Sequence, residues 1–433
     1  MAQNLRARLQ RLREAPSPKP VTGPPGNGPP VAGSSSRGSP LPGKKAPSPA
    51  LGSEWEEAGY QTFKRTGYLD LPISPDFPLP RSLPILIPDL LRYSPDLPGP
   101  EDMVFFDLET TGLSGGAGTV AFLAAFGRFV RSDSGMGAFR LRLDQYLLLD
   151  YPGEDEFLAA LLQEFEPGRG PPLVVTYNGK SFDSQILKTR CIMKGRRPPA
   201  YYPADLLHPA RRLWKRFLPS CSQGEIETAI LGLDRTGDVS GALAPDIWFS
   251  FLKTADPQPL MGICDHNRRD ILGLASLFSA LVRIADAPLV VQGKFRYDSE
   301  ALALRWREAL VKVRDRDFGE AVVEAGLELL AAAAEEHPRS ALVFAQDLLT
   351  QGHAGEGRRR LLRIARGSVD GVFRAAAYRV LAIDAEWRRK APGEALALVE
   401  EALALADAGE GQRRDFLRRE ERLRRRLGRE TRG

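Results

Sequence analysis

Residues 103–112 read MVFFDLETTG, and this stretch predicts both a fold and a chemistry. The apolar run at 103–106 indicates a buried strand, which ends in Asp107 and Glu109. Because side chains alternate along a strand, these two acids point to the same face. Paired carboxylates at the end of a buried strand are costly to desolvate unless a cation lies between them, and oxygen ligands suit Mg²⁺ or Mn²⁺. Taken alone, the pair also fits a solvated turn after a strand.

Two later segments supply further acids. A second buried strand is indicated by LVVTY at 173–177, and the turn after it ends at Asp183. Residues 266–270 read HNRRD, ahead of an apolar helical pattern. His266 and Asp270 are four residues apart, so they share one face of a helix. The chain therefore presents strand acids, then a turn acid, then a helical His and Asp.

This ordered set resembles the motifs of the DEDD 3′–5′ exonucleases in the ribonuclease H-like superfamily. Within it, DLETTGLSGGAGT at 107–119 is similar to the first motif of the bacterial YprB-like branch. Further segments similar to that branch are DLLH at 205–208, RRLW at 211–214, SCS at 220–222 and Glu227. The similarity covers roughly residues 55 to 285. It implies an α/β fold, a mixed five-stranded sheet flanked by helices, and hydrolysis of phosphodiester bonds.

The resemblance also implies a ligand set. Asp107, Glu109, Asp183 and Asp270 would hold two divalent cations, Mg²⁺ or Mn²⁺, about 4 Å apart across the scissile phosphate. One cation would orient and acidify the attacking water, and the other would stabilise the leaving 3′-oxygen. His266 would be the general base, because imidazole titrates near neutral pH. The His-containing subgroup usually has four residues between His and Asp, whereas this chain has three. A packing or capping role is therefore the alternative for His266.

Other polar residues near these motifs receive weaker assignments. Asn178 and Lys180, in the turn before Asp183, are candidate substrate-binding residues. Asn178 would bond a sugar or a backbone carbonyl that shapes the turn, and Lys180 would meet a phosphate, although exposed lysines are common. Asp205, on a later strand, is interpreted as a structural hydrogen-bonding acid. Asp265 is interpreted as a residue at the start of its helix.

Hydrophobic periodicity predicts the elements that carry these residues. The expected strands are about 103–109, 121–129, 139–149, 172–177 and 201–207, and the expected helices are about 154–165, 181–194 and 262–284. Short connections make the first three strands antiparallel. A right-handed crossover would place the fourth strand beside the first. That arrangement would bring Asp183 towards Asp107 and Glu109.

Composition divides the 433 residues into four predicted parts. Residues 1–52 form a Pro-, Gly- and Ser-rich basic tail, expected to be disordered because it can bury little apolar area. Residues 53–290 form the ribonuclease H-like exonuclease domain with an extended N-terminal lead-in. Residues 298–410 form an α-helical domain whose Gly-Glu pairs recur at spacings of 36 and 38, close to a tetratricopeptide period. Residues 411–433 form an Arg-rich helical tail.

Charge is unevenly distributed along the chain. The net charge is +7 for residues 1–50 and +6 for residues 411–433, which leaves −8 on the rest of a chain with net charge +5. The basic ends either add salt-sensitive attraction to phosphates or serve solubility alone.

The remaining composition indicates a cytoplasmic protein. The three cysteines lack disulfide or metal-site spacing, which is typical of a reducing compartment. The sequence has no run near the ~18 apolar residues of a membrane helix, and its N-terminus lacks the apolar core of a secretory signal. No membrane association is expected.

These observations predict a metal-dependent nuclease, a 3′–5′ exonuclease acting on single-stranded or 3′-terminal DNA or RNA by a two-metal mechanism. Nucleic acid is the expected partner, with a protein partner for the helical domain. One alternative is a non-catalytic scaffold that binds nucleic acid and proteins on a ribonuclease H-like fold. Another is an endonuclease with the same site.

Overall fold

A computed structural model describes residues 51–93, 96–112, 118–132, 139–166, 170–312, 318–405 and 409–430. By its contacts the chain divides into two units, Met1–Ser48 and Pro49–Gly433. The described residues all belong to the second unit. The predicted basic tail therefore lies almost wholly outside the described residues, as do 113–117 of the glycine-rich turn after the first acids.

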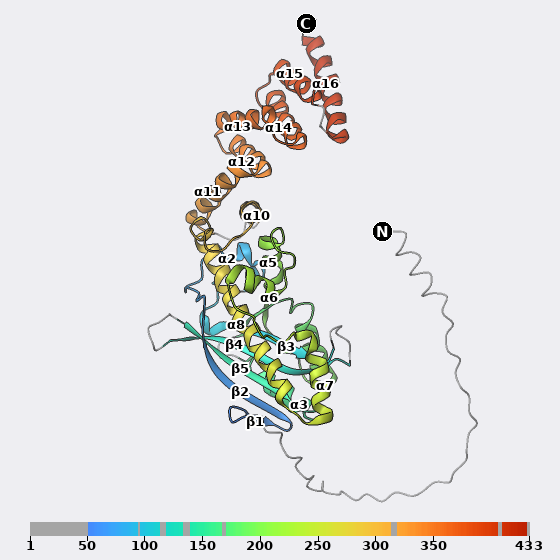
Figure 1. Ribbon diagram of the computed structural model, residues 1–433. Coiled ribbons are helices and arrows are strands. Elements are labelled where there is room, and N and C mark those ends of the chain that lie inside the picture. The colour runs from blue at the N-terminus through green and yellow to red at the C-terminus, as the bar shows by residue number, and fades with distance from the viewer. Residues whose placement is uncertain are drawn as a thin grey trace, which may run out of the picture. The chain divides into compact units, whose positions relative to one another are not determined.

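The second unit contains a seven-stranded mixed sheet with the order β1-β2-β5-β4-β3-β6-β7 (Figure 1). The strands are β1 (Glu56–Gly59), β2 (Thr62–Asp70), β3 (Met103–Thr110), β4 (Ala121–Arg131), β5 (Phe139–Leu148), β6 (Leu173–Thr176) and β7 (Tyr202–Asp205). Strands β1 to β5 pair with their neighbours in antiparallel fashion, whereas β6 is parallel to both β3 and β7. The mixed sheet, all five predicted strands and the predicted position of β6 beside β3 are confirmed.

The expected number of strands was wrong, because the N-terminal lead-in adds two more. β2 pairs with β5 along its whole length, from Thr62 opposite Leu148 to Asp70 opposite Arg140. Its sequence, TFKRTGYLD, mixes charged and apolar side chains and has few fully buried positions. Such a pattern suits a partly solvated sheet region and resembles an irregular segment in sequence.

Helices cover both faces of this sheet. The elements of this part are α2 (Leu83–Leu86), η1 (Pro88–Arg92), η2 (Pro100–Asp102), η3 (Tyr151–Gly153), α3 (Glu154–Gln163), α4 (Asp183–Met193), α5 (Leu207–Trp214), α6 (Gln223–Ile226), η4 (Glu227–Leu231), η5 (Gly241–Leu243), α7 (Ala244–Thr254), α8 (Gln258–Asp286) and α9 (Pro288–Val291). Met103 and Phe105 of β3 share one core with α2, α5 and much of α8. Val104 and Phe106 point the other way, into a core with α3, α4 and α7. The strand alternation that buries these residues also sets the direction of the acids that follow.

From residue 299 onward the described chain is all helical, as predicted from its composition. The elements are α10 (Ser299–Lys312), α11 (Glu320–Glu336), α12 (Pro338–Thr350), α13 (Ala354–Arg366), α14 (Gly371–Ile383), η6 (Asp384–Arg388), α15 (Pro392–Leu403) and α16 (Glu410–Glu430). Helices adjacent in sequence pack against each other. Among the described residues, no helix is both long and apolar enough to cross a membrane.

Candidate metal centre

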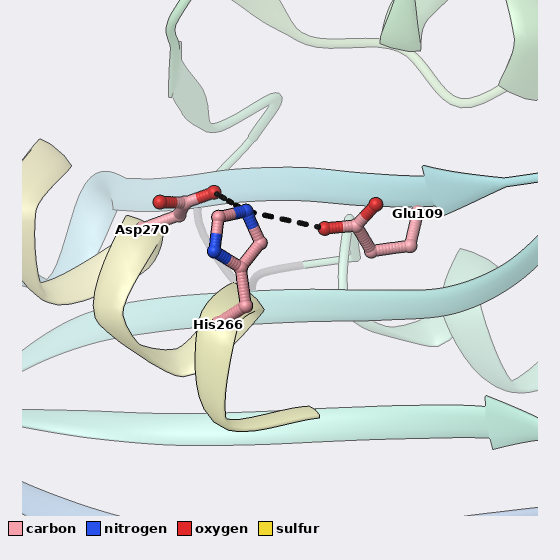
Figure 2. Close-up of side chains that lie close together, drawn as sticks. All are labelled: Glu109, His266 and Asp270. Carbon is pink, nitrogen blue, oxygen red and sulfur yellow. Dashed lines mark ion pairs between the residues drawn. The ribbon is translucent and has the colours of Figure 1, made fainter. Parts of the chain in front are cut away.

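Strand β3 and helix α8 bring three predicted site residues together. Glu109 lies near the end of β3, and His266 and Asp270 lie one turn apart on α8. Figure 2 shows the His266 ring between the two carboxylates. Its Nε2 lies 3.2 Å from Oδ2 of Asp270 and 3.9 Å from Oε1 of Glu109. One donor atom of each residue lies within 4.8 Å of the other two, which is close enough for a shared cation.

Asp107 and Asp183 complete the acidic cluster. Asp107 precedes Glu109 by two residues on β3, so both side chains project from the same face. Asp183 is the first residue of α4, immediately after the turn that follows β6, and it is buried. The negative charge of Asp183 raises the pKa values of Asp107 and Glu109, so Asp183 lies near both strand acids. The pairing of β6 with β3 therefore places Asp183 against the strand acids, as its expected position required.

The cluster makes ionisation of its carboxyl groups difficult. Burial, reinforced by the negative charges of Asp270 and Asp183, holds the pKa values of Asp107 and Glu109 well above their usual range. Burial likewise raises the pKa of Asp183 to about 7. A cation favours the charged form of such acids and removes their mutual repulsion. Because the donors are carboxylate oxygens with one imidazole, they fit Mg²⁺ or Mn²⁺.

Asp238, a residue in a loop, contacts Nδ1 of the His266 ring. Oδ2 of Asp238 lies 3.0 Å from His266 Nδ1. Nη1 of Arg235 donates to the same oxygen at 2.6 Å, and Nη2 of Arg235 donates to Oδ1 of Asp270 at 2.5 Å. Although burial acts in the opposite direction, the hydrogen bonds from Arg235 and His266 hold the pKa of Asp238 below its usual value. Arg235 thus fixes two of the three carboxylates near the imidazole, those of Asp238 and Asp270.

Glu227 binds the guanidinium group of Arg235 and holds it in place. Nε of Arg235 donates to Oε2 of the buried Glu227 at 2.6 Å. Nε2 of Gln223 donates to Oε1 of Glu227 and to the backbone oxygen of Asp270, both at 2.7 Å. Burial nevertheless raises the pKa of Glu227 to about 7. The segment similar to the YprB-like branch around Glu227 therefore supports Asp270 through Arg235.

A cavity of about 510 Å³ adjoins this cluster. It is lined by Gln223, Gly224, Glu225, Thr228, Arg235, Asp238, His266 and Asp270. The imidazole and one metal-ligating candidate are therefore accessible from solvent on this side.

The two candidate substrate residues lie apart from these acid contacts. Asn178 is exposed, with a left-handed backbone (φ 64°), and its N–H donates to Oδ1 of Asp205 at 2.9 Å. Nζ of Lys180 pairs with Asp89, so the charge expected to meet a phosphate has a carboxylate partner. Asp205 also accepts from the N–H groups of Lys180 and Leu207, which confirms its structural role.

The expected place of Asp265 at the start of its helix was wrong. Helix α8 begins at Gln258, so Asp265 lies one to two turns inside it. There it is half exposed and pairs with Arg65 and Arg268. The Pro-containing segment before the apolar pattern extends the helix backwards, because proline is well tolerated in a first helical turn.

Sequence reasoning missed Asn267, Gln145, Asp238 and Arg235. Asn267 is fully buried on α8, and its Nδ2 donates to Oδ2 of Asp107 at 2.7 Å. The signal for it was an amide on the apolar face of α8, in helical register with Ile263 and Ile271. Asp238 and Arg235 lie in an irregular loop, where periodicity gives no signal.

Comparison with known proteins supports the fold. The sequence profile of the RNase_H superfamily matches residues 104–282. The uncharacterized protein YprB of Bacillus subtilis (strain 168) is 41% identical over 180 residues, which are 41% of this chain and 41% of that protein. The chain thus matches well under half of that relative's length. Residues 104–282 form an RNase H-like domain.

A solved structure gives a weaker likeness. The family B DNA polymerase from the hyperthermophilic archaeon Pyrobaculum calidifontis has 14% sequence identity and a TM-score of 0.31, over 49% of this chain and 30% of the polymerase chain. A similarity this weak does not indicate the role of this chain.

Proposed function

We propose that the RNase H-like domain is a metal-dependent nuclease, a DEDD-type 3′–5′ exonuclease that hydrolyses phosphodiester bonds of DNA or RNA. One observation carries the proposal. Donor atoms of Glu109, His266 and Asp270 lie within 4.8 Å of one another. Asp107 and Asp183 lie near them, because the charge of Asp183 raises the pKa values of both Asp107 and Glu109. Members of the RNase H-like superfamily typically hydrolyse phosphodiester bonds. An acidic recess repels a phosphate unless cations intervene, which favours metal-assisted chemistry.

Asp107, Glu109, Asp183 and Asp270 are the proposed ligands of two divalent cations, Mg²⁺ or Mn²⁺. When bound, the cations supply charge neutralisation at the phosphate and acidify the attacking water. Arg235 holds Oδ1 of Asp270, so Oδ2 is the oxygen that faces His266 and the recess. The protein therefore presents Asp270 in one orientation before any cation binds.

His266 is the proposed general base. Its Nδ1 faces the Asp238 carboxylate, which would hold a proton on that nitrogen and leave Nε2 directed at the recess. A proton taken up at Nε2 creates an imidazolium, and Asp238 would stabilise that charge. The three-residue spacing to Asp270 is compatible with this role, because one helical turn puts both side chains on the same face.

The helical region is the proposed contact surface for a protein partner and has tetratricopeptide-like helix pairs. The three Gly-Glu pairs lie at the starts of α11, α13 and α15, so each marks the first helix of a pair. At Gly357 an added Cβ would lie 2.7 Å from the backbone oxygen of Ala345, so α12 and α13 approach closely there. We place the protein in the cytosol, in keeping with its three free cysteines.

The test is an incubation of the purified full chain with 5′-end-labelled single- and double-stranded DNA and RNA, in Mn²⁺, Mg²⁺ or EDTA. We expect a ladder of shortened products in either cation and intact substrate in EDTA. Asp107→Asn and Asp270→Asn should each lower the rate by roughly a hundredfold or more, since each removes a charged ligand without changing shape. Asp286→Asn is the matched control, because it alters an exposed acid on the same helix.

The same panel, with one circular substrate added, separates the alternative functions. Hydrolysis that persists undiminished in both Asp107→Asn and Asp270→Asn refutes the metal nuclease. Binding of nucleic acid without hydrolysis in any cation supports the non-catalytic scaffold. A covalently closed single-stranded circle distinguishes the remaining alternative, because an endonuclease cuts the circle and an exonuclease leaves it intact.

A further inference from the structure

One row of residues crosses four strands and ends at a proposed metal ligand. Arg65 of β2 lies opposite Gln145 of β5, Gln145 lies opposite Ala125 of β4, and Ala125 lies opposite Asp107 of β3. Directly opposed residues on antiparallel strands project to the same face of a sheet. Ala125 contributes only a methyl group to this row. A gap therefore separates Gln145 from Asp107 on the face that α8 covers.

Asn267 of α8 spans that gap. Its Oδ1 accepts a hydrogen bond from Nε2 of Gln145 at 2.8 Å, and its Nδ2 donates to Oδ2 of Asp107 at 2.7 Å. Nε of Arg65 donates to Oε1 of Gln145 at 2.7 Å. Gln145 and Asn267 are both fully buried, so water cannot replace the hydrogen bond between them. A continuous chain of three hydrogen bonds thus connects Arg65 to Asp107.

The arginine fixes the direction of every bond in this chain. Arg65 carries donors only, so the oxygen of the Gln145 amide must face it. The Gln145 amide nitrogen then faces α8, where it donates to Asn267 and to the backbone oxygen of Cys264 at 2.8 Å. The Asn267 oxygen must accept that bond, which turns its nitrogen towards Asp107. Reversal of either amide would bring like groups together in a buried space.

We propose that Arg65, Gln145 and Asn267 form a positioning relay that holds Oδ2 of Asp107 and leaves its other oxygen for a cation. This inference rests on the proposed function, in which Asp107 is a metal ligand. The relay begins on β2, outside residues 104–282 that match the superfamily profile. The two-stranded lead-in is therefore part of the site as well as an extension of the sheet. Partners that orient a metal ligand typically change metal affinity or activity by about 10- to 100-fold when altered.

Gln145→Glu tests the relay with a substitution of nearly equal shape. Glu accepts only, so it keeps the contact with Arg65 but cannot donate to Asn267. The Asn267 amide would turn over, and its oxygen would face Oδ2 of Asp107. We expect about tenfold weaker binding of Mn²⁺ by calorimetry and about tenfold lower kcat, with the KM for a single-stranded oligonucleotide unchanged. Arg140→Met is the matched control, since Arg140 pairs with the exposed Asp70 at the end of the same two strands.

A second pair of variants covers failure of Gln145→Glu to fold, which thermal unfolding would reveal. Arg65→Lys keeps a donor for Oε1 of Gln145, whereas Arg65→Met removes it, so only the methionine variant should lose Mn²⁺ affinity. Wild-type Mn²⁺ affinity and kcat in a folded Gln145→Glu, or equal values for the two Arg65 variants, overturn the relay. Failure of the proposed function looks different, because the unaltered chain would then show neither Mn²⁺ binding nor hydrolysis.

Discussion

His266 contacts three carboxylates, and the contacts permit two chemical roles. Asp238 lies on Nδ1, while Asp270 and Glu109 lie on the side of Nε2. A ring held in this way can accept a proton at Nε2 or donate its Nε2 lone pair to a cation. The two roles differ in what happens to metal affinity when the ring is removed.

His266→Gln is expected to lower kcat by roughly a hundredfold or more while Mn²⁺ affinity stays at the wild-type value, because a general base contributes about 10²- to 10⁴-fold. Single-turnover kinetics and Mn²⁺ calorimetry on the same preparation measure both quantities. A parallel loss of Mn²⁺ affinity would make His266 a ligand instead. Wild-type turnover would reduce it to a packing residue.

Asp238→Asn is expected to lower kcat about tenfold with KM unchanged, since the amide no longer stabilises the charged imidazole. If Asp238 acts through His266, the double variant with His266→Gln should turn over no more slowly than His266→Gln alone. Steady-state kinetics on the two single variants and the double variant provide this check. Multiplying losses would show that Asp238 has a separate role.

For single residues, the sequence predicted the acids of the site better than the residues that hold those acids in place. Asp107, Glu109 and Asp270 were identifiable because strand and helix periods place them on defined faces. Asn267 and Gln145 were missed, because a buried amide differs from a solvated one only through partners that are remote in sequence. Gln145 meets Asn267 across 122 residues, and only the folded sheet shows that contact.

Helix α8 and η4 approach each other closely at Gly273 and Glu227. An added Cβ at Gly273 would lie 1.7 Å from Oε1 of Glu227 and 2.1 Å from its Cδ. Glu227 is buried and bonded to Arg235, so its side chain has no free space to move into. Glycine at position 273 therefore leaves room for Glu227, which in turn holds Arg235 against Oδ1 of Asp270.

Gly273→Ala is expected to destabilise the fold by about 1–3 kcal/mol, the usual range for overpacking a buried contact, and to lower kcat by displacing Arg235. Chemical denaturation and steady-state kinetics measure the two effects. Gly293→Ala is the control, because an added Cβ there meets nothing within 4 Å. Equal free energies of unfolding for the two variants would contradict close packing of Glu227 against Gly273.

Elements were predictable where one pattern dominated. The run 103–106 identified β3, and the apolar helical pattern that follows Asp270 identified α8. The crossover rule placed β6 beside β3. The hairpin of β1 and β2 was not recognised, since β1 has only four residues and the sequence of β2 mixes charged and apolar side chains. Its pairing with β5 depends on a partner that lies about 80 residues away in the chain.

For the whole molecule, the raised pKa values predict an unusual response to pH in the absence of metal. Asp183 and Glu227 titrate at about 7 in the folded chain, against about 4 when unfolded. Between these values the folded state binds protons that the unfolded state has released. By linkage, the free energy of unfolding falls as pH rises through this window.

Asp183→Asn cannot ionise, so in EDTA it should lose less stability than wild type between about pH 5 and pH 8. At the upper pH the variant should be the more stable of the two. Mn²⁺ should then stabilise the wild type more than the variant, because the cation replaces the proton on Asp183. Thermal unfolding of both proteins across this range is the measurement, and parallel curves would contradict the raised pKa.

For the organisation of the chain, composition predicted a helical region after the α/β part, and the helices from α10 onward confirm it. Composition could not show that the first of these helices share a core with the sheet. Trp306 of α10 and Leu329 of α11 belong to the same buried cluster as Phe105 and Phe278. Such sharing depends on side chains that meet only after both parts have formed.

The acidic cluster that contains Asp107 and Asp270 is the proposed metal-dependent nuclease site. The most direct measurement is the release of mononucleotide from a 3′-labelled single strand, with Mn²⁺ or EDTA, by wild type, Asp107→Asn and Asp270→Asn. We predict release by wild type in Mn²⁺, none in EDTA, and a loss of roughly a hundredfold or more in both variants. Release that survives EDTA, or that is undiminished in both variants, would contradict the claim.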